Sequence, residues 1–144
     1  MNADQIRRFI LKDPIARTFF GGVVSSNNIP RASPSQKPKF YIVNTDPDYK
    51  PGEHWVVLWN DHISNYFDPT GRFPFFEAEA ALKRPWIWNS TRVQPLFSNK
   101  CGLFCLYFVY YKSRGYSMTD IVKSFFKWLR LNDKKVEKFY KFYR

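Results

Sequence analysis

The spacing of apolar residues predicts most helices and strands of this chain. Asn2 or Asp4 can cap a first helix that runs to about Leu11, with Ile6, Phe9 and Ile10 buried, and Asp13-Pro14 ends it. Short apolar runs predict strands at about 40–44, 55–60, 64–68 and 92–94. Longer segments with helical spacing predict helices at 73–82, 101–114, 118–131 and from Asp133 to about 143.

Three shorter segments have ambiguous patterns. Residues 19–24 are apolar but contain Gly21 and Gly22, and we interpret them as a tight turn between buried pieces rather than as a self-cleavage site. Residues 25–38 contain three prolines with several Ser and Asn residues and predict a surface loop. The aromatic run 86–88 is expected to pack over an edge of the sheet rather than to form an exposed binding patch.

Length and composition favour one domain, residues 1–144, of the α+β class. The 144 residues are 44% apolar and 20% aromatic, enough to bury a core. The expected architecture is a small, mostly antiparallel sheet packed with helices. No apolar run approaches eighteen residues and residues 1–11 lack a signal-peptide core, so we expect no membrane span and no secretion. The Asn89-Ser90-Thr91 sequon would then carry no glycan.

The cysteine positions indicate a reactive thiol. Ser98 and Asn99 can cap a helix whose first turn holds Cys101, where the helix N-terminus favours a thiolate. Cys105 lies one turn further into the helix, among apolar residues, where we expect a buried and unreactive thiol. Two cysteines four residues apart form no disulfide framework, which favours a reducing compartment. Two cysteines and two scattered histidines also give no metal-site spacing.

A nucleophilic cysteine requires a base, an orienting group and an oxyanion donor. His54 opens a buried strand and is therefore better fixed than His62, which lies on a hairpin turn. If strands 55–60 and 64–68 form that hairpin, Asp68 returns to His54 and can orient its imidazole. Gln94, seven residues before Cys101, could direct an amide N–H at an oxyanion.

These residues resemble the adenovirus-type cysteine proteases (adenain), within the clan of ubiquitin-like-protein proteases. The resemblance rests on the order His, Asp, Gln, Cys, on Phe40-Tyr41-Ile42-Val43-Asn44-Thr45, Gly52-Glu53-His54-Trp55 and Phe67-Asp68-Pro69, and on Cys101-Gly102-Leu103-Phe104-Cys105. It covers residues 5 to 112 well and the tail weakly. Asp68 stands where adenovirus enzymes have Glu, and this chain is shorter between Asp68 and Gln94.

The resemblance implies a papain-like or adenain-like fold with the nucleophile at the N-terminus of the central helix. Cys101 would be the nucleophile, His54 the base, Asp68 the orienting acid and Gln94 part of the oxyanion hole. Trp55 and Gly102 would line the substrate cleft. The expected protein is a monomeric viral cysteine endopeptidase from a virophage or related DNA virus, acting in the virion and in the reducing interior of the host cell.

The expected substrates are capsid or core precursors, cleaved after glycine in Gly-rich motifs during virion maturation. Two alternatives stay open: a ubiquitin- or SUMO-like deconjugating protease, and a non-catalytic basic DNA-packaging protein on a degenerate protease fold. The first needs a large protein-docking surface, for which the short chain leaves little room. Retention of all four site residues argues against the second.

The net charge of +11 indicates an anionic partner. Ten of the 23 Lys and Arg residues lie from Lys112 onward, against three acids. Six are expected to share one face of the C-terminal helices and to bind DNA without sequence preference: Lys123, Lys127, Arg130, Lys134, Lys138 and Lys141. Adenovirus enzymes use DNA as an activating polyanion, so the resemblance points the same way. They also use a disulfide-linked viral peptide, for which no spare cysteine exists here. The sequence indicates no other cofactor.

Overall fold

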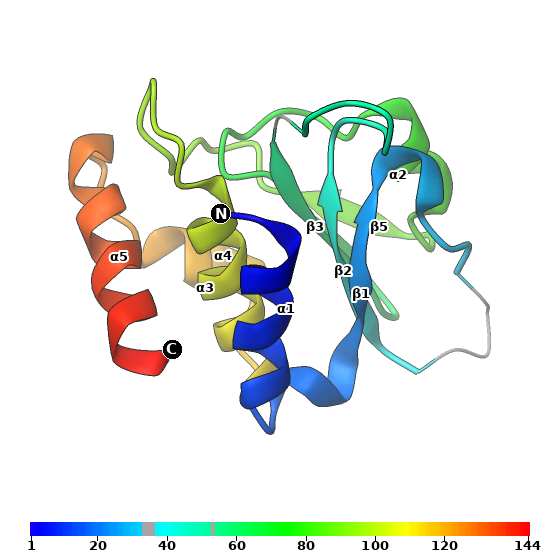
Figure 1. Cartoon of the computed structure of the whole chain (residues 1–144), viewed down its shortest axis with the longest axis horizontal. Helices are drawn as coiled ribbons and strands as arrows, with labels where there is room; N and C mark the ends of the chain where they lie inside the picture. Colours follow the sequence, from blue (N-terminus) through cyan, green and yellow to red (C-terminus); the bar gives the residue numbers. More distant parts are fainter. Residues whose placement is uncertain (33–36, 53) are drawn as a thin grey trace.

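A five-stranded sheet organises the chain (Figure 1). The computed structural model describes residues 1–32, 37–52 and 54–144. The strands follow one another in the order β1 (Phe20–Ser25), β2 (Lys39–Asn44), β3 (Trp55–Asn60), β4 (Ser64–Phe67) and β5 (Trp86–Trp88). The two central pairings, β2–β3 and β3–β4, are antiparallel, whereas β1–β2 and β4–β5 at the edges are parallel. The prediction of a mostly antiparallel sheet is therefore confirmed at the centre and wrong at both edges.

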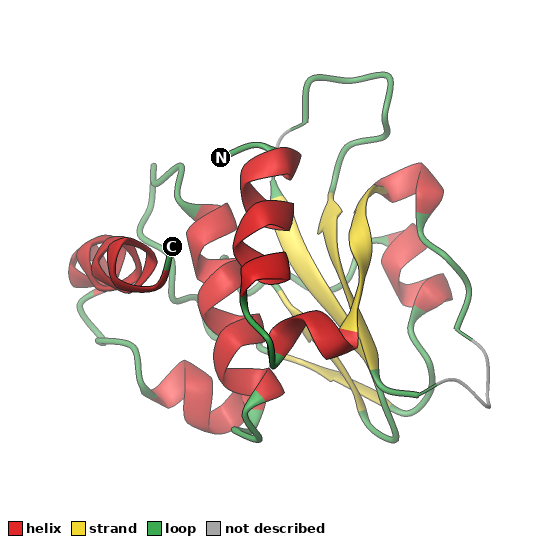
Figure 2. Cartoon of the chain, turned by 60° about the horizontal axis from the view of Figure 1, so that its bottom comes forward, coloured by secondary structure: helices red, strands yellow, loops and turns green. Residues whose placement is uncertain are grey.

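Alternating side chains divide the core between the two faces of the sheet. Phe40 and Ile42 of β2 point into one cluster, and Tyr41 and Val43 point into the other. The larger cluster lies beneath α1 (Ala3–Lys12), α3 (Cys101–Ser113), α4 (Met118–Lys123) and α5 (Asn132–Tyr143). The smaller cluster lies beneath α2 (Phe76–Ala81), on the opposite face (Figure 2). The sheet thus separates four helices from one.

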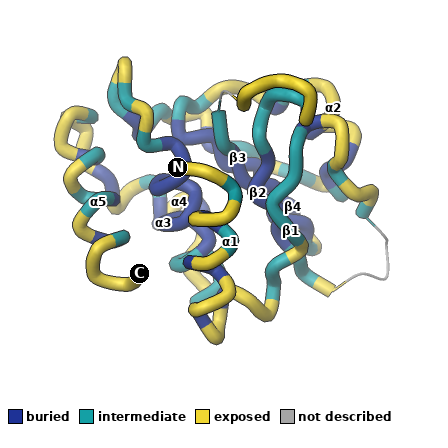
Figure 3. The backbone as a smooth tube through the Cα atoms, in the orientation of Figure 1, coloured by how far each residue is buried: buried dark blue, intermediate teal, exposed yellow. Residues whose placement is uncertain are grey.

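Helix α3 is the most deeply buried helix of the larger face (Figure 3). Every residue from Cys101 to Val109 is buried, and the helix packs on β3 and beside α1, α4 and α5. A helix that is apolar on every side, as this one is over its first turns, is typical of a helix buried in the core. The helix begins at Cys101 as predicted, but the cap is different. Lys100 is the N-cap residue, and the hydroxyl of Ser98 instead accepts the backbone N–H of Lys100 at 3.2 Å and donates to Asp133 Oδ1 at 2.8 Å.

The glycine pair does not form the expected tight turn. Gly21 and Gly22 lie within β1, which pairs with β2 in parallel. The ring of Tyr41 lies so close to Gly21 that a Cβ at this position would clash with it. Gly22 has a φ of 151°, a conformation that other residues rarely adopt. The pair therefore has a structural reason to be glycine, independent of cleavage.

Several other element boundaries differ from the prediction. The first helix has the expected position and buried residues, with Asn2 and Gln5 in a capping box. The helix expected at 73–82 is shorter, at Phe76–Ala81, and residues 92–94 are not a strand. The aromatic run 86–88 is the edge strand β5. Within the expected loop 25–38, Ser26–Asn28 form a 3-10 turn, and residues 33–36 lie outside the described part of the chain, as does residue 53 before His54.

The C-terminal region bends between α4 and α5, and the helix expected at 118–131 is α-helical only over Met118–Lys123 (α4). Helix α4 ends at Lys123, a 3-10 turn spans Leu129–Leu131, and α5 begins at Asn132. Asn132 is fully buried, and it accepts the backbone N–H of Phe126 at 2.8 Å. Its amide nitrogen donates to Val93 O at 2.8 Å and to Phe126 O at 3.0 Å. These bonds give partners to backbone N–H and C=O groups at the bend. Local helix propensity does not predict such contacts.

Because of the bend, the six cationic residues expected to share one helix face do not do so. Lys123, Lys127 and Arg130 lie before α5 and outside its helical register, whereas Lys134, Lys138 and Lys141 share a side of α5. Of the apolar residues of α5, Val136 and Phe139 are buried, but Tyr143 is 41% exposed. The prediction of one six-residue DNA-binding face is therefore wrong in geometry. DNA binding itself stays a prediction.

We expect Asn132→Ala to lower the free energy of unfolding by about 2–4 kcal/mol, because it removes the side-chain partner of three backbone groups, one in a buried hydrogen bond and two in partly buried ones. Urea unfolding followed by circular dichroism measures the change. Asn99→Ala, at an exposed asparagine, is the control and should stay within about 0.5 kcal/mol. Equal stability of the two variants would show that the bend does not depend on Asn132.

None of the helices in the described residues is long and apolar enough to cross a membrane.

Candidate active site

Cys101 lies where α3 meets a surface cleft. This cleft has a volume of about 410 Å³, and its walls include Cys101, Trp55 and Asn99 together with the β2–β3 loop. Cys101 occupies the first turn of α3, so the positive end of the helix dipole faces its sulfur. A buried helix thus brings Cys101 to the cleft, and its place in the first turn is the position that the sequence predicted for a reactive thiol.

The β3–β4 hairpin brings His54 and Asp68 together. Val57 pairs with Phe67 in the antiparallel register, so Asp68 falls opposite Val56, two residues after His54 and within side-chain reach of it. His54 Nε2 is 2.7 Å from Asp68 Oδ1. Asp68 is almost fully buried, and the His54 side chain is 15% exposed. With Nε2 engaged by the carboxylate, Nδ1 is the ring nitrogen left for the hydrogen bond to Cys101.

The protonation of Cys101 and His54 is coupled. Burial alone would raise the pKa of the Cys101 thiol, but the hydrogen bond and charge of His54, with backbone N–H groups of Trp55 and Gly102, lower it overall. Burial would lower the pKa of His54, yet its bonds to Asp68 and Cys101 raise that pKa to about 9. Both shifts favour a thiolate–imidazolium pair near neutral pH.

Asp68 is held by two residues that the sequence analysis did not identify. Its Oδ1 also accepts the N–H and hydroxyl of Thr70, at 2.8 and 2.7 Å. The buried side chain of Asn89 accepts the Asp68 backbone N–H at 2.8 Å and donates to the Asp68 carbonyl at 2.6 Å. Asn89 was considered only as part of a glycosylation sequon. The one sequence feature that could have indicated this role is that Asn89 is a polar residue directly after the aromatic segment 86–88.

Gln94 is buried beside the segment that leads into α3. Its Nε2 donates to Ser98 O at 2.9 Å, three residues before Cys101. An amide nitrogen carries two hydrogens, so a second N–H remains for another acceptor. Its Oε1 is buried and has no hydrogen-bond partner among the described residues. This places the predicted oxyanion donor on the loop before α3, although residues 92–94 form no strand.

The structure places Trp55, but not Gly102, on the wall of the cleft. Trp55 lines the cleft with Cys101, and its Nε1 donates to Met1 O at 3.1 Å. Gly102 does not lie on the cleft wall as expected; it is buried, and a Cβ there would come within 3.2 Å of Met1 side-chain atoms. His62 is exposed on the β3–β4 turn, where the sequence predicted it. It therefore lies at the opposite end of the hairpin from Asp68.

Cys105 has the surroundings of a structural thiol. It is fully buried, and its sulfur donates to Trp55 O at 3.3 Å. Burial, with the nearby charges of Cys101 and Asp68, raises its pKa well above the usual value. Its thiol is therefore protonated under conditions that favour a Cys101 thiolate.

Among residues 1–32, 37–52 and 54–144, no group of three or more His, Cys, Asp and Glu side chains is arranged to hold a metal ion.

Two adenovirus proteins are similar to this chain, although no protein-family model matches it. A protein named Protease from ovine adenovirus D serotype 7 (isolate OAV287) is 34% identical over 89 residues, which cover 48% of this chain and 44% of that protein. A protein named Protease from bovine adenovirus 4 is 36% identical over 96 residues, or 51% of this chain and 48% of that protein. The chain therefore matches just under half the length of each relative. The resemblance to adenovirus-type proteases is confirmed.

We expect Asp68→Asn to leave a weak but measurable enzyme. The amide keeps the shape of the carboxylate but removes the charge that supports protonated His54. We expect kcat/KM to fall about 10²–10⁴-fold, with the pKa of His54 moving below about 9. Peptide turnover across pH measures both. Thr70→Val removes only the hydroxyl contact and should cost less than about tenfold; an equal loss in the two variants would contradict an electrostatic role for Asp68.

Proposed function

We propose that this chain is a viral cysteine endopeptidase that processes capsid or core precursors, cleaving after glycine in Gly-rich motifs. The observation that carries the proposal is the 2.7 Å bond between His54 and Asp68, together with the contact of His54 with Cys101, which lines the cleft. Similarity to two adenovirus proteins named Protease supports the same class. The precursor substrates and the glycine preference follow from the resemblance.

The first half of the proposed reaction acylates Cys101. Its thiolate attacks the scissile carbonyl, and the carbonyl oxygen gains negative charge. The free N–H of Gln94 and the backbone N–H of Cys101 donate to that oxygen. The protonated His54 gives its Nδ1 proton to the leaving amine, so the C–N bond breaks and a thioester remains.

Hydrolysis of the thioester completes the cycle. Neutral His54 takes a proton from water, which attacks the thioester carbonyl and releases the carboxylate product and the thiolate. Asp68 holds the imidazole orientation through both halves and stabilises its charge. Asn89 and Thr70 keep Asp68 in place. Each group therefore has a role that its contacts support.

Cleavage of candidate precursors tests the proposal. The purified chain is incubated with a panel of viral capsid and core precursors and with ubiquitin- and SUMO-like fusions, and the products are identified by mass spectrometry. We expect new C-termini at glycine in precursors only, and no products from Cys101→Ser. Cleavage confined to the ubiquitin-like fusions would favour a deconjugating protease, and no cleavage with retained DNA binding would favour a packaging protein.

A further inference from the structure

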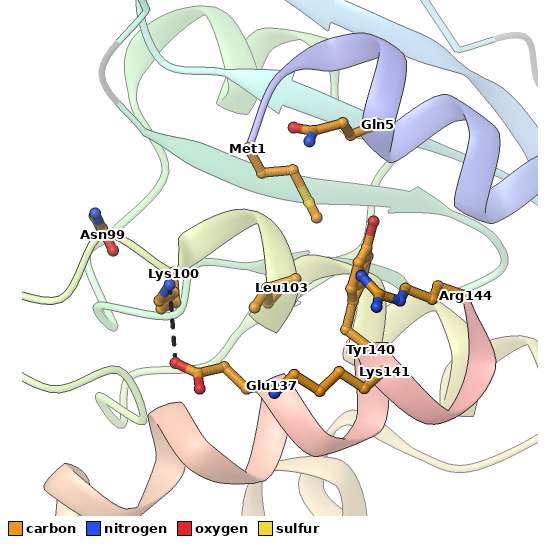
Figure 4. A pocket seen from close by; sticks show the side chains of 9 residues that line it. All are labelled: Met1, Gln5, Asn99, Lys100, Leu103, Glu137, Tyr140, Lys141 and Arg144. Carbon is orange, nitrogen blue, oxygen red and sulfur yellow. Dashed lines mark ion pairs between the residues drawn. The ribbon is translucent and has the colours of Figure 1, made fainter.

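A second pocket lies next to the catalytic cleft, between α1, the start of α3 and the C-terminal half of α5 (Figure 4). Its volume is about 430 Å³. Lys100, Lys141 and Arg144 supply three positive charges, against one negative charge from Glu137. Leu103 and Tyr140 supply apolar surface. The pocket therefore combines excess positive charge with a partly apolar wall.

The pocket and the catalytic cleft share part of their walls. Met1 and Asn99 line both, and Lys100 directly precedes Cys101. Figure 4 shows Met1 on one side of the pocket, with Lys100 and the α5 side chains across from it. A peptide bound over Cys101 would thus enter the pocket as it passes Met1.

The charges of the pocket are incompletely compensated. Lys100 Nζ lies 3.8 Å from Glu137 Oε1, and both side chains are 39% exposed. Such an exposed, long ion pair contributes little stability, so Lys100 can exchange Glu137 for another carboxylate. Lys141 in the last turn of α5 and Arg144, its C-cap residue, also line the pocket. The site is complementary to a short acidic segment with an apolar component.

We propose that this pocket selects substrates that carry acidic side chains a few residues from the scissile bond; the inference rests on the proposed function. From Glu137 to the C-cap residue Arg144, the end of α5 rises about 10 Å at roughly 1.5 Å per residue. An extended peptide covers that length in about three residues. One to three acidic residues within such a stretch would contact Lys100, Lys141 and Arg144. The carboxylates would displace Glu137 from Lys100 and add specificity without taking part in bond cleavage.

Matched peptides test this selection. A neutral glycine-containing substrate is compared with versions in which one Glu replaces Gln at each of six positions, three on each side of the scissile bond. At low ionic strength, we expect Glu at one or two adjacent positions on one side to raise kcat/KM about fivefold over Gln. The gain should disappear in about 0.5 M salt, because these charges are solvent-exposed.

Variants assign the preference to the pocket. The double variant Lys141→Ala/Arg144→Ala should reduce the Glu-to-Gln ratio to about one, whereas Glu137→Gln should raise it about twofold. The double variant Arg17→Ala/Arg31→Ala removes two exposed cations outside the pocket and should leave the ratio unchanged, which controls for net charge. Circular dichroism checks that each variant is folded.

A Glu-to-Gln ratio near one in the wild type, or a ratio that survives the double variant, would overturn the proposal. Cleavage of the Gln peptide separates this result from a failure of the proposed function. If neither peptide is cleaved, fluorescence anisotropy of labelled peptides with Cys101→Ser still tests whether the pocket prefers acidic side chains. Tighter binding of the Glu peptide that is lost in the triple variant with Lys141→Ala/Arg144→Ala supports it, and equal binding overturns it.

Discussion

Replacing Cys101 by Ser should abolish peptide cleavage while Cys105→Ala retains most turnover. A serine hydroxyl at position 101 would not ionise beside His54, so the loss should be on the order of 10⁶-fold in kcat. Cys105 lies fully buried one turn away, with its thiol bonded to Trp55 O. Its replacement should lower the free energy of unfolding by about 1 kcal/mol. Steady-state kinetics and urea unfolding measure the two effects.

The two cysteines also differ in expected reactivity towards electrophiles. Iodoacetamide at pH 7 should label Cys101 first, because the environment lowers the pKa of Cys101 and raises that of Cys105. Peptide mapping by mass spectrometry identifies the labelled residue. Equal loss of turnover in folded Cys101→Ser and Cys105→Ala, or faster labelling of Cys105, would contradict the assignment of the nucleophile.

Removing the base should have the second largest effect. His54→Ala should reduce kcat/KM about 10²–10⁴-fold, because the leaving amine and the attacking water lose their proton donor and acceptor. It should also raise the pKa of Cys101, since burial then acts without the opposing bond and charge of His54. Alkylation of Cys101 at pH 7 should consequently slow at least about tenfold. His62→Ala, at the exposed histidine, is the control and should change neither quantity.

The direction of the pH dependence follows from the same pair. As pH rises through the lowered pKa of Cys101, the thiolate forms and activity increases. As pH rises further through about 9, His54 loses its proton and activity declines. In His54→Ala the alkylation profile should shift to higher pH and lose the influence of this second ionisation. An unchanged profile, or a lethal His62→Ala, would contradict the assignment of the base.

The sequence was sufficient to predict that His54 lies beside Asp68 and that α3 begins at Cys101, because both arrangements depend on local connections. A short turn between two apolar strands implies an antiparallel hairpin, and the hairpin alone returns Asp68 to His54. The polar-to-apolar change at Cys101 likewise marks the start of a buried helix. Both features depend on segments of fewer than fifteen residues, for which hydrophobic spacing is a strong signal.

The features that could not be predicted depend on contacts between distant segments. Strand β1 exists because β2 offers a parallel partner, and Gly21, one of the two glycines that suggested a turn, packs against the ring of Tyr41. The bend before α5 is fixed by Asn132 bonding to Val93, 39 residues away. Asn89 similarly clamps Asp68 from 21 residues away. Local propensity and helical spacing contain no information about such partners.

The central claim, that Cys101 attacks the substrate with His54 and Asp68 as its base and orienting acid, is tested most directly by trapping the acyl-enzyme. Acid quenching during the first turnover of a glycine-containing ester substrate, followed by proteolysis and mass spectrometry, locates the thioester. We expect the acyl mass on the peptide that contains Cys101, at reduced yield in Asp68→Asn and absent from His54→Ala within the same time. Product formation without an adduct on Cys101, or an acyl group on another residue, would contradict the account.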